Sequence, residues 1–258
     1  MANNRLPPYR KDLDLPDKDD EADALALACY YFDHRDSPHR WVQVRDRVVA
    51  RMRELTLRLA HYNRVQSPII NRLRQDLAWQ FPEVALVRSV SYNGNLPLLW
   101  GWMAGRRTSK KYDRAHERTV GTGVSFESKQ AASMLCDLQK MERWCERELV
   151  QLIAGDDRFK PYLRVMSRFG FGLRVSCLLL SQIFPLENYL EDGRPVIKVR
   201  RGRESKKPTK RRLSERRFKK ALGVAPEREW SGDEKRKSRK AGSSLCRTAL
   251  WQWCFTRI

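Results

Sequence analysis

The sequence predicts a mainly α-helical protein, and three long stretches with helical periodicity support this prediction. Apolar residues recur at spacings of three and four in residues 41–65, 68–80 and 127–154, which places them on one side of a helix. The chain has 258 residues, of which 41% are hydrophobic. It is therefore long and apolar enough to fold around a core, and a wholly disordered chain is excluded.

The charge of the chain points to an acidic partner. The formal net charge is +21 at pH 7, and nucleic acid is the usual partner of so basic a protein. A basic protein of membrane surfaces would carry a similar charge, but the sequence has no lipidation signal. Since it also has no run of 18 apolar residues and no apolar signal-peptide core, we expect no membrane partner.

The cysteines favour a reducing compartment. None of the six forms a CxxC pair, and their spacing fits no common zinc ligand set. Cys177 lies in an apolar run and Cys254 lies between Trp253 and Phe255, so we expect buried free thiols. This expectation places the protein in the cytoplasm.

The N-terminal part is expected to contain one helix. Residues 1–16 are polar and contain prolines, which indicates an extended segment, and residues 17–32 follow as a helix capped by Asp17. Its expected buried residues are Ala24, Leu25, Leu27, Ala28, Tyr31 and Phe32. Asp20 and Asp23 are three residues apart on one face, and two close carboxylates are a candidate Mg²⁺ site. The alternative is an acidic first turn that only stabilises the helix dipole.

The middle of the chain is expected to form long helices. Residues 41–65 and 68–80 would make a helical hairpin or a coiled-coil dimerisation element, with intramolecular packing as the alternative. An irregular basic segment separates them from the helix at 127–154, which Gly155 ends. We therefore expect domains at residues 1–35, 36–155 and 156–258.

Two glycines and a basic run in the last domain suggest contact with nucleic acid. Gly170 and Gly172 lie between two helical segments, as in a helix-hairpin-helix unit, where backbone N–H groups approach a phosphate; a plain tight turn is the alternative. The run from Arg194 to Lys220 holds many cations and few acids, and we expect its first part to be a flexible loop that orders on nucleic acid. The cations that we expect to contact phosphates of the nucleic acid are Arg200, Arg201, Lys206, Lys207, Lys210, Arg211, Arg212, Lys235, Arg236 and Lys237.

The stretch from Leu213 to Trp253 reads as a helix, a turn, an exposed Ser-Gly pair, a basic loop and a second helix. Ser214 is the expected cap of the first helix and Gly223 its end, while Ser243 or Ser244 caps the second. Ser231 precedes Gly232 among several cations, an arrangement that could present a nucleophile to a phosphodiester. The alternative is an ordinary turn in a solvated loop.

Taken in order, these segments resemble the DEDD (RuvC-like) transposases and site-specific recombinases related to the pilin-gene invertases of the Piv/MooV type. The motifs that carry the resemblance are Asp20-Glu21-Ala22-Asp23-Ala24 for D-x-x-D-A, Arg168 to Gly172 for a P-G-I-G hairpin, Phe218 to Gly223 with Pro226, Ser231 and Gly232 for a P-x-x-S-G run, and Gly242 with residues 245–250 for a closing G-N-x-x-L-R-x-x-L helix. Phe169 replaces the hairpin proline, and Ser243 replaces the asparagine.

The resemblance implies a RuvC-like nuclease domain, a coiled-coil segment and a C-terminal transposase domain. It implies Mg²⁺ held with the help of Asp20 and Asp23, attack on DNA by Ser231, DNA and a structured guide RNA as partners, and homo-oligomers formed through the helical region. The first Asp and the Glu of the nuclease site have no room before Asp17, so we expect only the last helix of that domain, a truncated chain and uncertain activity. The alternatives are a non-catalytic basic nucleic-acid-binding protein derived from a transposase, and a basic ribosome-associated protein.

Overall fold

The computed structural model describes residues 6–15, 19–36, 41, 45–91, 94–201, 208–225, 230–231, 234–235 and 242–256. Most of these residues are helical, which confirms the predicted fold class. The chain divides into two units, Met1–Arg47 and Val48–Ile258, and each is described by itself.

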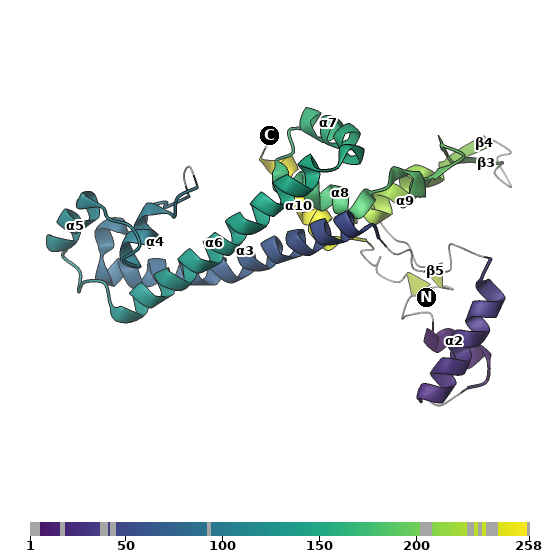
Figure 1. The fold of residues 1–258 in the computed structure, drawn as a ribbon, viewed down its shortest axis with the longest axis horizontal. Coiled ribbons are helices and arrows are strands. Elements are labelled where there is room, and N and C mark those ends of the chain that lie inside the picture. Colours follow the sequence, from purple (N-terminus) through teal and green to yellow (C-terminus); the bar gives the residue numbers. More distant parts are fainter. Residues whose placement is uncertain are drawn as a thin grey trace. The chain divides into compact units, whose positions relative to one another are not determined.

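The α-helices (Figure 1) are α1 (Leu6–Asp12), α2 (Asp20–His34), α3 (Arg47–Gln80), α4 (Leu98–Met103), α5 (Lys110–Glu117), α6 (Phe126–Ala154), α7 (Lys160–Arg168), α8 (Leu173–Ile183), α9 (Leu213–Ala221) and α10 (Ser244–Phe255). Short 3₁₀ helices are η2 (Pro82–Val84), η3 (Asp157–Phe159) and η4 (Leu186–Tyr189). The strands form three antiparallel pairs, which are β1 (Leu190–Glu191) with β2 (Arg194–Pro195), β3 (Ile197–Arg201) with β4 (Pro208–Arg212), and β5 (Trp230–Ser231) with β6 (Glu234–Lys235).

In the first unit, α1 and α2 pack together, so the prediction of an extended segment is wrong for residues 6–12. Two prolines lie in the first turn of α1, where backbone N–H groups have no partner within the helix and proline is tolerated. Tyr9 donates a hydrogen bond to Asp33, which raises the pKa of Tyr9 to about 12. The Arg10 guanidinium lies 2.6 Å from an oxygen of Asp23. These contacts give α1 a partner that periodicity alone could not indicate.

The predicted buried face of α2 is wrong. Ala26 and Tyr30 are the buried residues of this helix, whereas Tyr31 is 53% exposed and Phe32 is 70% exposed. The reason is that α1 covers the side of α2 that carries Tyr30, whose ring also contacts those of Tyr9 and His34. The N-cap is Asp19, which accepts a hydrogen bond from the Ala22 N–H; Asp17 lies outside the described residues.

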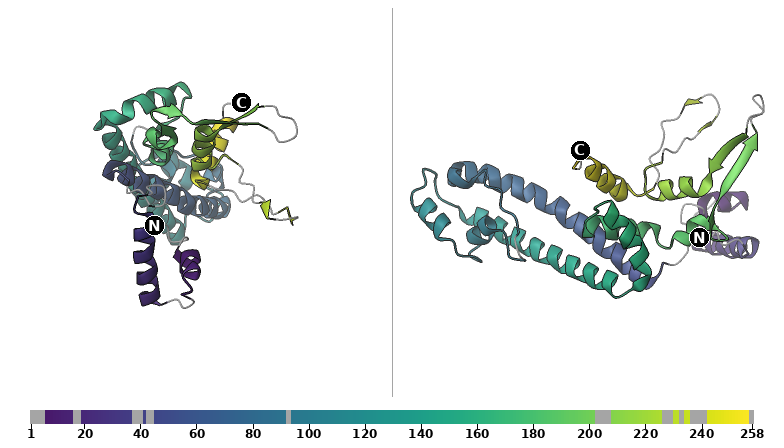
Figure 2. Two further views of the ribbon diagram at one scale, coloured as in Figure 1. Left: turned by 90° about the vertical axis from the view of Figure 1, so that its right-hand side faces the viewer. Right: turned by 90° about the horizontal axis from the view of Figure 1, so that it is seen from above.

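The second unit is built on the pair of long helices α3 and α6, which lie side by side in Figures 1 and 2. The expected break near residue 66 does not occur, since α3 continues through Pro68. A proline inside a helix costs about 3 kcal/mol, but apolar residues on both sides of it, such as Leu59 and Leu73, are buried. The predicted helix at 127–154 is confirmed, with Gly155 as its C-cap.

Polar contacts fix α3 and α6 in an antiparallel pair. Arg51 in the first half of α3 lies 2.6 Å from Glu148 in the last half of α6. Further along α3, the Gln66 amide donates a hydrogen bond of 3.1 Å to Glu142. The packing seen here is therefore intramolecular, and dimerisation through these helices stays a prediction.

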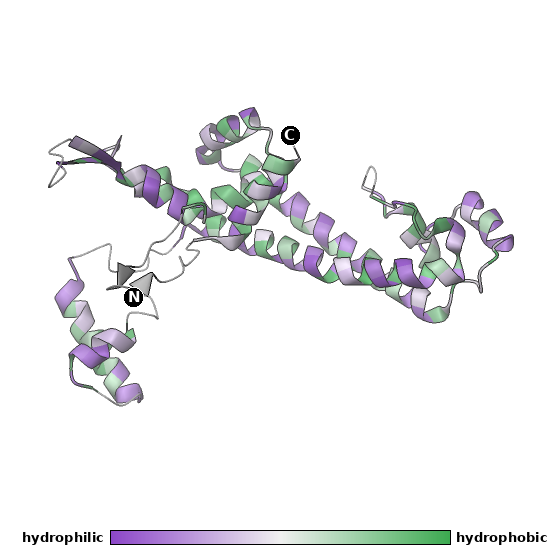
Figure 3. Ribbon diagram, turned by 180° about the vertical axis from the view of Figure 1, so that it is seen from behind, coloured by the Kyte–Doolittle hydropathy of each residue, from purple (hydrophilic) through white to green (hydrophobic). Residues whose placement is uncertain are grey.

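Two apolar cores lie at opposite ends of this helix pair. One core joins α3 and α6 to α7, α8, α9 and α10, and includes Leu55, Leu149, Leu180 and Cys246. The other joins them to η2, α4 and α5, and includes Phe81 and Trp100. Along α3 and α6 in Figure 3, hydrophobic and hydrophilic residues are interspersed, as expected of helices that bury one side. The first core supports the elements that carry the candidate site.

Candidate nucleic-acid interface

The basic ribbon, formed by strands β3 and β4, is the most cationic regular element described. Every residue of β4 is exposed, and the ribbon is largely hydrophilic in Figure 3. The prediction of a flexible loop is therefore wrong for residues 197–201 and 208–212, which pair as strands. The alternation in Ile197-Lys198-Val199 is typical of a strand and could have indicated it.

The register of the basic ribbon places like charges opposite each other. Lys198 pairs with Arg211, and residues directly opposite in an antiparallel pair have side chains on the same face about 5 Å apart. Among the ion pairs between described residues, none involves Lys198, Lys210 or Arg211. Like charges so placed are destabilising. A polyanion between or beside them would remove this repulsion.

An open hollow of about 600 Å³ lies at the base of the basic ribbon. It is lined by Lys210, Arg212, Glu215, Arg216, Lys219, Val224 and Ala225. The one acid is engaged, since the Lys219 ammonium 2.6 Å away holds the pKa of Glu215 below its ordinary value. Arg212 lies 3.5 Å from the same carboxylate. Lys210 and Arg216 have no carboxylate partner within the described ranges, so the hollow keeps a positive charge suited to phosphate.

Helix α9 ends beside this hollow in a glycine turn. Gly223 has φ +74°, and the backbone N–H groups of Gly223 and Val224 donate to the carbonyls of Lys220 and Lys219. This is the Schellman arrangement, which favours glycine at its left-handed position. The prediction that Gly223 ends the helix is confirmed. Ser214 is not the N-cap that we expected, because α9 already begins at Leu213. The Ser214 hydroxyl instead donates a hydrogen bond to the Tyr189 carbonyl and accepts one from the Val196 N–H.

The chain returns to the same point after residue 241, and we call Gly223, Gly242 and Ser243 the glycine junction. A β-carbon on Gly242 would lie 1.8 Å from the Lys220 carbonyl oxygen and 2.8 Å from the Gly223 nitrogen. The Ser243 N–H donates to the Ala221 carbonyl. The two ends of the segment 224–241 are therefore held against each other at the end of α9.

Helix α10 begins at the glycine junction. The Ser243 side chain accepts a hydrogen bond from the Cys246 N–H at 3.2 Å, which confirms Ser243 as the N-cap. One turn into α10, the Arg247 guanidinium donates to the Gly223 carbonyl at 3.0 Å. Cys246 is fully buried beneath α8. We did not predict a role for Arg247 from the sequence. The one indication in the sequence is that it is a single arginine on an otherwise apolar helix.

The candidate nucleophile lies in the segment that the glycine junction closes. The backbone of Ser231 forms β5, which pairs with β6 so that Ser231 is opposite Glu234. The side chains of Ser231, Lys235 and Arg200, and the whole of Lys206, Lys207, Arg236 and Lys237, lie outside the described residues. Their roles stay predictions. Of the other chosen cations, Arg201, Lys210, Arg211 and Arg212 are exposed on the basic ribbon.

The two hairpin glycines join α7 to α8. Gly170 has φ +65°, and it follows α7 in a second Schellman arrangement, with N–H groups of Gly170 and Phe171 donating to Ser167 and Met166. Gly172 is the N-cap of α8, and a β-carbon there would meet nothing within 4 Å. The backbone at the start of α8 is thus approachable, but the Trp253 indole of α10 donates to the Phe169 carbonyl and covers one side of the turn.

The carboxylates Asp20 and Asp23 do not by themselves fit a magnesium site. Both lie in the first turn of α2, but Asp23 is ion-paired with the largely buried Arg10, and Asp20 is exposed. Over the described ranges, no three side chains of His, Cys, Asp or Glu come close enough to hold a metal ion. We therefore derive no chemical step through a metal.

Within the part of the chain that the structure describes, no helix has the length and apolar character that a membrane crossing needs.

Comparison with curated proteins and with solved structures finds no match. Residues 204–258 match the family model described as "Transposase IS116/IS110/IS902 family". The matched segment contains β4, α9, the glycine junction and α10, so the C-terminal part of this chain is similar to a domain of those transposases.

Proposed function

We propose that this protein is a transposase-like protein that binds DNA and takes part in cleaving and joining DNA strands during transposition. The observation that carries this proposal is the match of residues 204–258 to a transposase family. That segment includes the cations of β4 and the hollow beside α9. The proposed activity and the positive charge thus belong to one part of the chain.

The basic ribbon is the proposed DNA contact. A two-stranded antiparallel ribbon fits the major groove of B-form DNA, whereas the major groove of an RNA duplex is too narrow to admit it. Lys198, Lys210 and Arg211 would lie against phosphates and release their counterions. A structured guide RNA is a second proposed partner, and it would bind by its backbone to the exposed cations outside the groove contact. The hairpin with Gly170 and Gly172 is a further proposed phosphate contact.

Ser231 is the proposed nucleophile. Its hydroxyl would lose a proton and attack a DNA phosphorus, so that a bond between Oγ and phosphorus forms and the bond to one deoxyribose oxygen breaks. That oxygen takes up a proton and leaves as a free hydroxyl end. Because one phosphate ester replaces another, the step conserves bond energy and the joined strand can be restored by the reverse attack. Cations beside the phosphorus would stabilise the charge of the transition state.

The helical region is proposed to join copies of the chain. Met134, Met141 and Trp144 lie on α6 at spacings of seven and three and are 60%, 42% and 48% exposed. This spacing is that of a coiled-coil seam, and a second copy could cover it. All six cysteines are free thiols, and we propose a cytoplasmic location for the protein.

A non-catalytic DNA-binding protein derived from a transposase is the second candidate. The observation that favours it is the ion pair between Asp23 and Arg10, which occupies one of the two carboxylates of the predicted magnesium site. Such a protein would keep the basic ribbon and bind DNA without forming a covalent bond to it.

A covalent-adduct assay separates the two candidates. The substrate is a supercoiled plasmid that carries the DNA bordering this protein's own gene, and the products are separated under denaturing conditions. The proposal predicts a protein–DNA adduct that Ser231→Ala abolishes and that Ser167→Ala, a change of an exposed serine on α7, leaves intact. Salt-dependent binding without any adduct would support the non-catalytic protein, and an adduct that survives Ser231→Ala would refute the nucleophile.

A further inference from the structure

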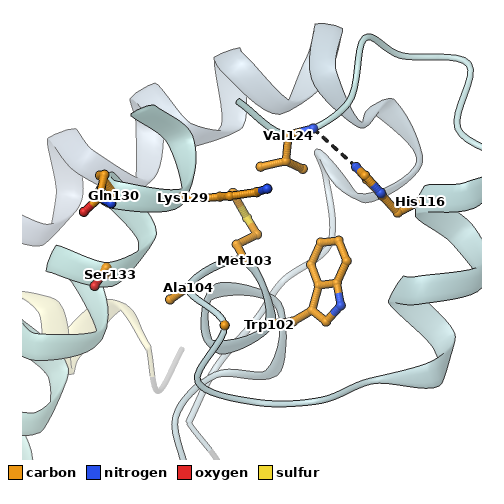
Figure 4. A pocket seen from close by; sticks show the side chains of 9 residues that line it. Trp102, Met103, Ala104, His116, Val124, Lys129, Gln130 and Ser133 are labelled. Carbon is orange, nitrogen blue, oxygen red and sulfur yellow. Dashed lines mark hydrogen bonds between the residues drawn. The ribbon is translucent and has the colours of Figure 1, made fainter. Parts of the chain in front are cut away.

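A second hollow lies far along the chain from the transposase-like segment, between α4, α5 and the start of α6. It has a volume of about 470 Å³, within the range of small-molecule sites. Its lining, drawn in Figure 4, is Trp102, Met103, Ala104, Gly105, His116, Val124, Lys129, Gln130 and Ser133. None of these residues belongs to the interface described above.

One wall of this hollow is aromatic and held in place. The Trp102 indole contacts the rings of Phe81, Tyr112 and His116 with centroids 5.6 to 5.8 Å apart. Its N–H donates to Asp113 at 2.7 Å. His116 Nε2 accepts a hydrogen bond from the Val124 N–H at 3.3 Å, shown as the dashed line in Figure 4. This hydrogen bond holds the imidazole ring in place beside the Trp102 indole.

The opposite side of the hollow carries two polar side chains without a partner among the described residues. Lys129 and Gln130 are exposed on the first turns of α6, and neither side chain has a hydrogen bond or ion pair to another described residue. The neighbouring cation Arg106 is engaged, since it lies 2.5 Å from Asp137 and donates to the Ser133 hydroxyl at 2.8 Å. The Lys129 side chain extends across the hollow toward Val124 and His116 in Figure 4. The hollow therefore has a lysine ammonium and a glutamine amide among its lining groups on the α6 side, and an aromatic wall on the other side.

We propose that this hollow binds a nucleotide, with its base against Trp102, its base edge at the Gln130 amide and its phosphate at Lys129. A flat base gains about 1–3 kcal/mol by stacking on an aromatic side chain. An amide supplies both a donor and an acceptor for a base edge, and ammonium is a common partner of phosphate. The nucleotide is either free in solution or an unpaired nucleotide of a bound strand. The inference is independent of the proposed function, because the lining lies wholly outside residues 204–258.

The test follows the Trp102 indole N–H signal by NMR, assigned through its loss in Trp102→Phe, as nucleoside 5′-monophosphates are added to the full chain. We expect a saturable shift, and we expect Lys129→Gln to weaken binding about tenfold, the effect of about 1.4 kcal/mol. Lys140→Gln is the matched control, since it removes the same charge from α6 about three turns further on. Neither lysine is buried, so neither change should unfold the chain.

Competing ligands identify what the hollow recognises. Tighter binding of a short single-stranded oligonucleotide than of a monophosphate would assign the ligand to a bound strand, and equal binding would assign it to a free nucleotide; both support the proposal. Equal competition by inorganic phosphate would reduce the hollow to an anion site and overturn it. An unmoved Trp102 signal at millimolar nucleotide, or equal effects of Lys129→Gln and Lys140→Gln, would also overturn it.

Discussion

Gly242 lies against the end of α9 so closely that a β-carbon on it would stand 1.8 Å from the Lys220 carbonyl oxygen. A side chain at position 242 could be accommodated only if α9, or the start of α10 that follows Gly242, moved. The glycine junction therefore depends on the absence of a β-carbon at Gly242 as much as on its hydrogen bonds.

The first prediction concerns Gly242→Ala. We expect the free energy of unfolding to fall by roughly 2–3 kcal/mol, because the change combines backbone strain at φ +83° with a contact that α9 cannot relieve. Urea denaturation followed by circular dichroism measures it. Gly193→Ala is the control, since Gly193 has φ +72° but a β-carbon there meets nothing within 4 Å. Equal losses for the two variants would mean that strain alone, and not the contact, acts at Gly242.

The second prediction concerns the salt dependence of DNA binding. If Lys210 contacts a phosphate, Lys210→Gln lowers the slope of log affinity against log salt by about 1. Fluorescence anisotropy with a labelled duplex at several salt concentrations gives the slope. Lys140→Gln removes a charge from α6 and should leave the slope unchanged. An unchanged slope for Lys210→Gln would take that lysine out of the interface.

The third prediction separates the stability of the basic ribbon from its function. Lys198→Glu places a carboxylate opposite Arg211, and an opposite-charge pair across two strands contributes roughly 0.2–1 kcal/mol. We expect a higher melting temperature together with weaker DNA binding. Lys198→Gln removes the repulsion without adding attraction, so its melting temperature and its DNA affinity should lie between those of the parent protein and those of Lys198→Glu. Stronger binding by Lys198→Glu would show that the ribbon does not face a polyanion.

The fourth prediction concerns thiol reactivity. Burial raises the pKa of Cys177 to about 12 and also raises the pKa of Cys136, Cys145 and Cys246, so these thiols stay protonated and inert at neutral pH. Cys254 is exposed, and its predicted burial is wrong because it lies on the outer side of α10. Brief alkylation at pH 7.5 followed by mass spectrometry should modify Cys254 first. Modification of Cys177 at a similar rate would contradict the packing of α8.

The fifth prediction concerns pH. The Arg106 guanidinium holds the pKa of Asp137 below its ordinary value, so the pair stabilises the fold above that ordinary value and the contribution is lost as the pH falls through the lowered pKa. Since Asp137 is about half exposed, we expect Asp137→Asn to cost only about 0.5 kcal/mol at neutral pH. The difference between variant and parent should shrink below about pH 4, as measured by urea denaturation across pH. A difference that grows on acidification would contradict the sign.

Periodicity was sufficient to predict the long helices but not their ends or their partners. The apolar spacing of α6 gave its bounds to within a residue, whereas Pro68 suggested a break that packing along α6 overrides. For α2, Tyr31 and Phe32 looked as apolar as Tyr30, and only the position of α1 decides which of them is buried. Such choices depend on contacts between segments, which a single sequence does not record.

The candidate site was predicted in its residue types rather than its geometry. The basic run was evident from composition, but its strand register, and with it the Lys198–Arg211 opposition, required the structure. Glycine and serine at 223 and 243 were expected as helix ends, and both are. That the two ends touch, with Arg247 across them, could not be inferred because they are far apart in sequence.

The segment that bears Ser231 begins after Gly223 and ends before Gly242, and these two glycines lie against each other at the end of α9. A segment whose two ends lie together can change in length or composition while the helices that hold those ends keep their places. Selection, or an engineer, could therefore exchange this segment as a cassette and retain the scaffold that carries it.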